Sequence, residues 1–254
     1  MFRGIVWIVC FWWLWMPMAI AGELGDRAAQ FPNWQGKPPV RMAKGDLIYP
    51  QWMAGTWDVT STLVETIAPL APDIVTPGYE VNRRYLDRSL QFQVRFQPQS
   101  PSESGLNSDG ESDAPIVADR AFNGESIARA YLGPDSEVSV RVDPDNPNRQ
   151  ITRIPPKRQL VSVVRGRNSE RLNPDRFVAT EVAYQVFRTR PQIYLNEVET
   201  TTVYYRTSPT RIESDQMTAI YLSPKDPNYF RANGRPVALY RYRLQLDRST
   251  DNVS

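Results

Sequence analysis

The sequence predicts an all-β fold: an antiparallel meander of about eight to ten strands that closes into a barrel, with one short helix and an N-terminal arm. Three observations predict it. Segments in which apolar and polar residues alternate recur from residue 55 to residue 247. Turns rich in Pro, Asn and Gly separate these segments, and helical periodicity is nearly absent. A sheet of this size usually closes on itself or splits into a sandwich, because either arrangement removes exposed edges.

The first long strands show the alternation most clearly. Trp57, Val59, Ser61 and Leu63 share one face of the first strand, and the residues between them are polar. Residues 90–97 alternate in the same way, with every second side chain apolar. Three prolines in residues 68–78 predict a loop between the two strands. Residues 116–122 are consistent with a further strand.

Residues 123–133 form the best candidate for a short helix, with Asn123 as its N-cap and Gly133-Pro134 at its end. Ile127, Ala130 and Tyr131 share one face of it. The remaining segments alternate as strands do and are separated by turn chemistry. They are residues 137–142, 149–154, 160–165, 177–188, 194–206, 211–222 and 237–247.

The N-terminus has the features of an export signal. Arg3 precedes an apolar run that ends near Met16, and Ala19-Ile20-Ala21 gives a small-x-small cleavage pattern. We expect cleavage after residue 21, although an uncleaved N-terminal anchor is an alternative. Residues 22–50 then form an arm that Phe31 and Trp34 pin to the body, and residues 51–248 form one β domain. The Ser- and Asp-rich residues 98–115 interrupt that domain as a flexible insertion.

Composition excludes several kinds of site. The single cysteine, Cys10, lies in the export signal, and the chain contains no histidine, so disulfides, Ser-His-Asp triads and His-ligated metals are excluded. We therefore expect no metal and no cofactor. The 30 basic and 28 acidic residues nearly balance, and no basic run is dense enough to indicate nucleic acid. Only four of the basic residues are lysines, a bias that suits anionic partners or reflects background composition.

Gly55-Thr56-Trp57 opens the first long strand directly after the arm. This placement resembles the lipocalin and calycin pattern, in which such a tryptophan closes one end of the barrel and an arginine of the last strand packs across it. Arg248 has the parity of the apolar face of the last strand, and that strand should pair with the first in a closed meander. We therefore expect Arg248 over Trp57, stabilised by about 1 kcal/mol. A core tryptophan beside a turn is the alternative.

A second resemblance covers most of the chain after residue 21. The segments GDLIYPQWMAGTWDV (residues 45–59) and ALYRYRL (residues 238–244) resemble an uncharacterised family of cyanobacterial and chloroplast proteins that carries a domain of unknown function. The resemblance implies a thylakoid-lumen or periplasmic location. It supplies no catalytic residues.

A barrel of this size is wide enough to hold a small hydrophobic molecule, such as a lipid or pigment. The residues expected to line such a cavity are aromatic and point inward: Phe92, Phe96, Tyr184, Tyr204, Tyr240 and Tyr242. The same residues would also fill a solid β core. We expect a monomer in either case.

Two other functions remain open. A calycin-like enzyme would have to use carboxylates and tyrosines, and the candidates are Asp58, Glu65, Glu181, Glu197 and Glu199. Glu197 and Glu199 point to the same face and either line a polar cavity or meet water. Alternatively, the protein is an accessory or assembly factor that binds a membrane protein complex. The aromatic arm (Phe31, Trp34, Tyr49, Trp52) and the insertion would then be its contact elements.

Overall fold

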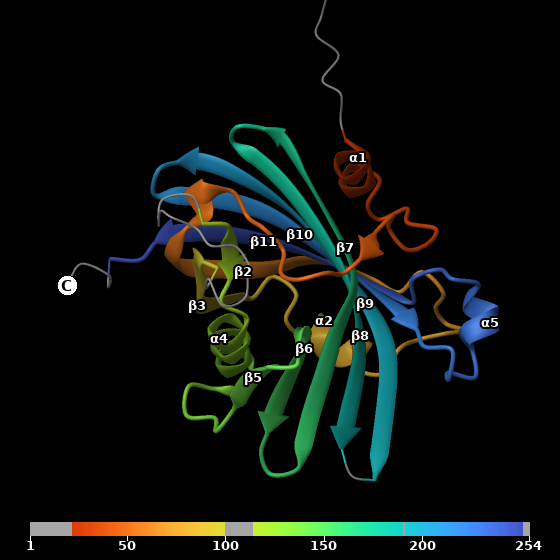
Figure 1. Ribbon diagram of the computed structural model, residues 1–254. Coiled ribbons are helices and arrows are strands. Elements are labelled where there is room, and N and C mark those ends of the chain that lie inside the picture. Colours follow the sequence, from red (N-terminus) through yellow and green to blue (C-terminus); the bar gives the residue numbers. More distant parts are fainter. Residues whose placement is uncertain (1–21, 100–113, 190, 251–254) are drawn as a thin grey trace, which may run out of the picture.

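The computed structural model describes residues 22–99, 114–189 and 191–250; the proposed export signal and most of the insertion at 98–115 lie outside the described residues. Four helices and eleven strands are present in these ranges (Figure 1). The helices are α1 (Glu23–Ala29), α2 (Tyr79–Arg83), α4 (Arg120–Leu132) and α5 (Tyr229–Ala232), and one 3₁₀ turn spans Gln51–Met53. The strands are β1 (Arg41–Met42), β2 (Gly55–Ile67), β3 (Ser89–Pro98), β4 (Ile116–Ala118), β5 (Ser139–Asp143), β6 (Asn146–Ile154), β7 (Arg158–Asn173), β8 (Arg176–Thr189), β9 (Gln192–Ser208), β10 (Arg211–Leu222) and β11 (Ala238–Arg248).

Ten of the strands form one continuous antiparallel path in the order β4-β3-β2-β11-β10-β9-β8-β7-β6-β5, and β1 pairs with β7. The path curls into a half-barrel, which confirms the prediction of an all-β, barrel-like fold. The first long strand, β2, pairs with the last strand, β11, and Trp57 lies opposite Arg248 in that register. This is the pairing that a closed meander predicts.

The two ends of the path are joined by α4 instead of by a strand pair. The helix contacts β3 on one side and β5 and β6 on the other (Figure 1). Gly124 permits the close approach to β5 and β6, because a Cβ atom there would lie 2.6 Å from Gln150 Nε2 and 3.0 Å from Val140 Cγ1. The helix therefore covers edges that would otherwise expose unpaired backbone groups.

The helix begins earlier than the sequence predicts. Its N-cap is Asp119, whose carboxylate accepts a hydrogen bond from the Phe122 amide at 3.1 Å, and Asn123 lies inside the first turn. The strand expected at 116–122 correspondingly ends at Ala118. Asp119 is itself a preferred capping residue. The side chain of Asn123 instead forms hydrogen bonds with the edge of β3.

The two faces of the sheet carry different clusters. On the inner face, residues from strands far apart in the path meet around Trp57, among them Phe96 of β3, Phe177 of β8 and Leu246 of β11. Strands that are not neighbours can share a cluster only across the concave side. The outer face carries Val178, Met217 and Leu239 among others, and α1 and the following residues cover it.

The arm is more ordered than its prolines suggest. It contains α1, whose Leu24 is fully buried, and β1, which pairs with β7. Phe31 and Trp34 are 9% and 4% exposed and pack on the outer face, as expected. The Leu24 amide donates to both carboxylate oxygens of Glu170, at 3.2 and 3.1 Å, so β7 supplies a negative charge to the first turn of α1.

Candidate functional site

A cavity of about 270 Å³ lies on the inner face of the half-barrel. Strands β2, β3, β9, β10 and β11 form its wall, and α4 supplies one side through Asn123, Ile127 and Tyr131. The lining is largely aromatic and aliphatic, with a few polar side chains between. Its residues are Tyr49, Val59, Ser61, Phe92, Val94, Phe96, Ala118, Asn123, Ile127, Tyr131, Tyr204, Gln216, Thr218, Tyr242, Leu244 and Leu246.

The structure brings together four of the six predicted lining residues: Phe92, Phe96, Tyr204 and Tyr242. Tyr240 also faces inward but packs further along the sheet with Leu63 and Tyr79, and its hydroxyl accepts a hydrogen bond from Asn82 Nδ2 at 3.3 Å.

Tyr184 has the parity of Val178 and therefore lies on the outer face, where Arg165 is 5.2 Å from its ring centre. The polar–apolar alternation of β8 did not distinguish its faces, because both are covered. Inward and outward side chains are similarly apolar in such a strand.

Sequence reasoning missed Tyr49 and Tyr131 as lining residues. Tyr49 comes from the end of the arm, where an isolated bridge pairs it with Ile116, and its ring lies 4.7 Å from that of Phe96. Tyr131 comes from α4 and meets the ring of Tyr85 at 5.3 Å. The shared helical face of Ile127 and Tyr131 was the available signal for the second of these.

The cavity tyrosines are held in their neutral form. Burial raises the pKa of Tyr204 to about 12 and also raises the pKa of Tyr49 and of Tyr242 well above the ordinary value. Burial also raises the pKa of Tyr131. The hydroxyl groups therefore remain hydrogen-bond donors throughout the physiological pH range. They can offer a ligand polar contacts without charge.

One further polar group lies near the cavity but is not part of its lining. Ser214 pairs with Tyr204 on one side and Leu244 on the other, which places it on the inner face between two lining residues. Ser214 is 5% exposed, and its hydroxyl has no hydrogen-bond partner among the described residues. A buried hydroxyl without a partner is costly, so this group favours an additional acceptor or donor nearby.

One end of the half-barrel is closed by Trp57 and Arg248. The guanidinium carbon of Arg248 lies 4.6 Å from the Trp57 ring centre, and its Nη1 donates to Ala54 O at 3.2 Å. Trp57 is fully buried, and its Nε1 donates to Met53 O at 2.8 Å. Gly55 has φ 115°, and a Cβ there would lie 2.7 Å from Arg248 Nη1. The expected Trp57–Arg248 contact is therefore present, and Gly55 makes room for it.

Comparison with known protein families identifies one match for this chain. The model of a domain of unknown function, DUF6816, matches residues 41–250. The chain belongs to the DUF6816 family. No curated protein and no solved structure shows significant similarity to it.

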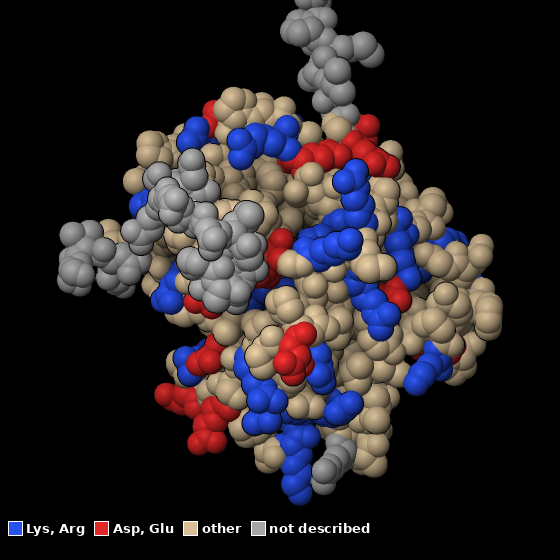
Figure 2. All heavy atoms as spheres, viewed as in Figure 1, with Lys and Arg blue, Asp and Glu red and all other residues tan. Residues whose placement is uncertain are grey.

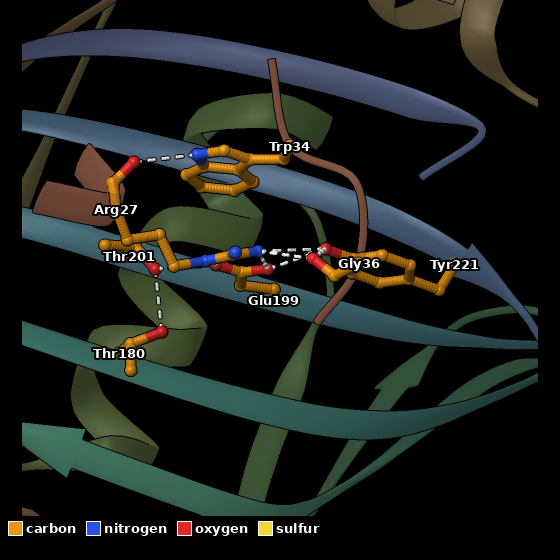
Figure 3. Close-up of polar contacts among 7 residues, drawn as sticks. All are labelled: Arg27, Trp34, Gly36, Thr180, Glu199, Thr201 and Tyr221. Carbon is orange, nitrogen blue, oxygen red and sulfur yellow. Dashed lines mark hydrogen bonds and ion pairs between the residues drawn. The ribbon is translucent and has the colours of Figure 1, made fainter. Parts of the chain in front are cut away.

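The DUF6816 half-barrel is fastened to the arm by a buried ion pair on its outer face (Figure 3). Arg27 of α1 donates from Nε and Nη2 to the two carboxylate oxygens of Glu199, each at 2.6 Å. The side chain of Glu199 is fully buried and that of Arg27 is 11% exposed. Thr201 donates to Glu199 Oε1 at 2.9 Å, and the Tyr221 hydroxyl lies 2.8 Å from Oε2.

The same cluster extends into the arm. Arg27 Nη2 also donates to Gly36 O at 2.8 Å, and Trp34 Nε1 donates to Arg27 O at 2.8 Å. The Arg27 guanidinium lies 4.2 Å from the Trp34 ring centre. Burial acts to lower the pKa of Arg27, but the Glu199 carboxylate outweighs this effect and the pKa is raised. Every polar group around Glu199 is paired, so we interpret the cluster as a clamp that fixes the arm.

The other carboxylates considered for catalysis are dispersed. Glu181 pairs with Arg167 at 2.8 Å, Glu197 pairs with Lys37 on the outer face, and Asp58 accepts from Gln93 at 2.8 Å. Glu65 lies opposite Arg241 in the β2–β11 register. Contrary to the view that Glu199 lines a cavity or meets water, the arm buries it. In the described ranges, no group of acidic residues or cysteines has a geometry that could hold a metal ion.

Arg241 and Arg243 of β11 have the opposite parity to Arg248 and lie on the outer face. Arg243 is exposed. Arg241 has the same parity but is half-buried, because it pairs with Asp215 and lies 6.0 Å from the ring centre of Phe31 in the arm.

Over residues 22–99, 114–189 and 191–250, none of the helices combines the length and the apolar character needed to cross a bilayer.

Proposed function

We propose that this protein binds a small hydrophobic molecule in the cavity of the half-barrel, in the manner of a lipocalin. The observation that carries the proposal is the aromatic cavity beneath α4, in which neutral tyrosine hydroxyls surround apolar walls. Predominantly apolar walls with a few fixed polar groups are typical of small-molecule sites. A solid core would instead fill this volume with side chains.

The lining specifies the chemistry of the ligand. Phe92, Phe96 and Leu244 favour apolar rings or chains, and the hydroxyls of Tyr204 and Tyr242 favour one uncharged oxygen function. Since no unpaired charged side chain lines the cavity, a carboxylate or phosphate would lose its hydration without compensation there.

The size of the cavity limits the ligand further. Its volume lies just below the range of about 300–1,000 Å³ that is common for small-molecule pockets. The proposal therefore favours a ring-sized molecule, or the end of a longer lipid or pigment whose remainder leaves the cavity. Because Ile127 and Tyr131 belong to α4, a larger ligand requires this helix to shift.

The alternatives have less support from the geometry. The arm would be the contact element of an accessory or assembly factor, but Phe31 and Trp34 are buried against the protein's own sheet. An enzyme would need a carboxylate beside a reacting group, whereas Glu181, Glu197 and Glu199 are each paired with a cation. For location, we propose export to a thylakoid lumen or periplasm, supported by the signal-like N-terminus and by the resemblance of residues 45–59 and 238–244.

Native mass spectrometry of the protein purified from its own source tests the proposal. We expect a bound small molecule that denaturation releases, and displacement of that molecule by an apolar fluorescent dye such as N-phenylnaphthylamine. The substitution Ser61→Phe places a ring in the cavity and should abolish binding of both. A protein that carries no molecule and fails to bind the dye would contradict the proposal.

A matched control lies on the same strand. Thr60 is adjacent to Ser61 but points to the outer face, so Thr60→Phe adds the same bulk without entering the cavity. Thr60→Phe should therefore bind the dye as the unaltered protein does. Near-ultraviolet circular dichroism of both variants verifies that the fold is retained.

A further inference from the structure

Two turns of the sheet lie side by side at the end of the molecule opposite the β7–β8 turn. One joins β6 to β7, where Ile154 pairs with Arg158, and the other joins β8 to β9, where Thr189 pairs with Gln192. Arg158 and Thr189 also pair with each other, so the two turns are neighbours. They project together at the bottom of Figure 1. We call residues 153–159, 187–189 and 191–193 the hairpin-tip surface.

The hairpin-tip surface is strongly cationic. Arg153, Lys157, Arg158 and Arg188 line an open groove of about 680 Å³, and no carboxylate lines it. In the described part of the chain, none of these four residues takes part in an ion pair, whereas arginines elsewhere commonly do. Blue side chains project at the corresponding end of Figure 2.

The same surface exposes apolar side chains. Ile193 is 64% exposed and Phe187 is 38% exposed, although both belong to long strands whose other residues are mostly covered. Pro155, Pro156 and Pro191 are exposed beside them. Apolar side chains at a projecting tip, surrounded by unpaired cations, combine the two forces that hold proteins at a membrane interface.

We propose that the hairpin-tip surface docks on a lipid bilayer that contains anionic headgroups. The headgroup phosphates pair with the four cations, and Ile193 enters the boundary between headgroups and acyl chains. Two projecting turns suit a deformable bilayer better than they suit a protein partner, because a stable protein interface needs a broad complementary surface. The proposal does not depend on whether the cavity holds a ligand.

The α5 turn provides a matched comparison within the same chain. It exposes Phe230 even more, at 87%, and Arg231 lies next to it. However, Arg231 donates to Asn228 Oδ1 at 2.8 Å, and the acidic Asp226 lies in the same turn. Exposure of an aromatic residue is therefore shared by both sites, whereas a groove lined by four cations and no carboxylate belongs to the hairpin-tip surface.

The test measures binding to vesicles of phosphatidylcholine mixed with phosphatidylglycerol and to vesicles of phosphatidylcholine alone. The protein is expressed with its own N-terminus in an exporting host and purified in the form which that host releases. We expect binding to the mixed vesicles about tenfold tighter than to the neutral ones, and weaker binding at high salt. The variant Lys157→Glu/Arg158→Glu should lose this preference, and Phe230→Ala should keep it.

Insertion is measured separately with an environment-sensitive fluorophore. Because Cys10 is the only cysteine, Gln192→Cys and Phe230→Cys each add one defined labelling site outside the N-terminal segment. A probe at position 192 should brighten and shift to shorter wavelength on mixed vesicles, while a probe at position 230 should not. Equal binding to both kinds of vesicle, an unchanged preference in the charge-reversed variant, or a probe at position 192 whose fluorescence does not change on mixed vesicles would each overturn the proposal.

Discussion

Asn123 of α4 pairs with both backbone polar groups of Arg95 in β3. The Arg95 amide donates to Asn123 Oδ1 at 2.6 Å, and Asn123 Nδ2 donates to the Arg95 carbonyl at 3.1 Å. One helix turn later, Ser126 Oγ accepts from the Gln93 amide at 2.9 Å. Side chains of a helix thus take the place of a neighbouring strand along this edge. The cavity wall formed by α4 depends on these bonds.

Replacing Asn123 with alanine should loosen this edge. The change leaves the Arg95 amide without its partner, so we expect a loss of about 1–3 kcal/mol in the free energy of unfolding, measured by urea denaturation. Ser126→Ala removes a single bond and should cost less. The dye affinity of the cavity should fall in Asn123→Ala under conditions in which the protein remains folded. An unfolding curve that superimposes on that of the unaltered protein would contradict this account of the edge.

The order of strands and most of their bounds could be predicted from the sequence, because alternation and turn residues are local properties. β10 extends over the predicted residues 211–222, whereas β7 continues eight residues beyond the predicted Arg165. That second half contains Gly166, Arg167 and Glu170. It pairs with β8 on one edge, and the arm pairs with Gly166 and Arg167 on the other. Contacts with a segment more than a hundred residues away leave no periodic signal.

The candidate site was predictable to a similar extent. Parity placed Phe92, Phe96, Tyr204 and Tyr242 correctly on the inner face, since each strand is regular there. The parity of Glu197 and Glu199 was also correct, but their partners were not predictable. Lys37 and Arg27 come from the arm, whose path over the outer face depends on tertiary packing.

The buried clamp leads to a prediction about stability. Arg27→Met leaves the Glu199 carboxylate buried without a countercharge, and Glu199→Gln leaves Arg27 in the same position. Each should cost about 3–5 kcal/mol of unfolding free energy. The double variant should cost clearly less than the sum of the two, because it contains no isolated buried charge. Urea denaturation of the four proteins gives this coupling free energy directly.

A control for the clamp lies two residues away on the same face of β9. Lys37 and Glu197 form an ion pair with side chains 39% and 21% exposed, so water already solvates both groups. Lys37→Met and Glu197→Gln should each change the free energy of unfolding by no more than about 1 kcal/mol. Equal costs for the two pairs would show that burial does not determine the strength of the clamp.

The tyrosines predict how stability depends on pH. Burial raises the pKa of Tyr204 to about 12 in the folded protein, and the pKa of Tyr221 is also raised, by burial and by Glu199. In the unfolded chain a tyrosine titrates near about 10. The folded state thus holds protons that the unfolded state releases, so the stabilisation is complete below pH ~10 and is lost as the pH rises towards ~12. Urea denaturation across this range should show decreasing stability, and Tyr204→Phe should reduce the slope.

The contact between Arg248 and Trp57 gives the last prediction. Arg248→Met removes the charge above the ring and the bond to Ala54 O, so we expect a loss of about 1–2 kcal/mol. For a chain of this size, that corresponds to roughly 2–8 °C in the midpoint of thermal unfolding. Arg243→Met is the matched control, because Arg243 is an exposed arginine of the same strand that points to the outer face, away from Trp57. Gly55→Ala should destabilise more than either, since the new Cβ displaces Arg248 and the backbone at φ 115° disfavours any side chain. If Arg248→Met and Arg243→Met unfold at the same temperature, the arginine contributes nothing to closing this end of the half-barrel.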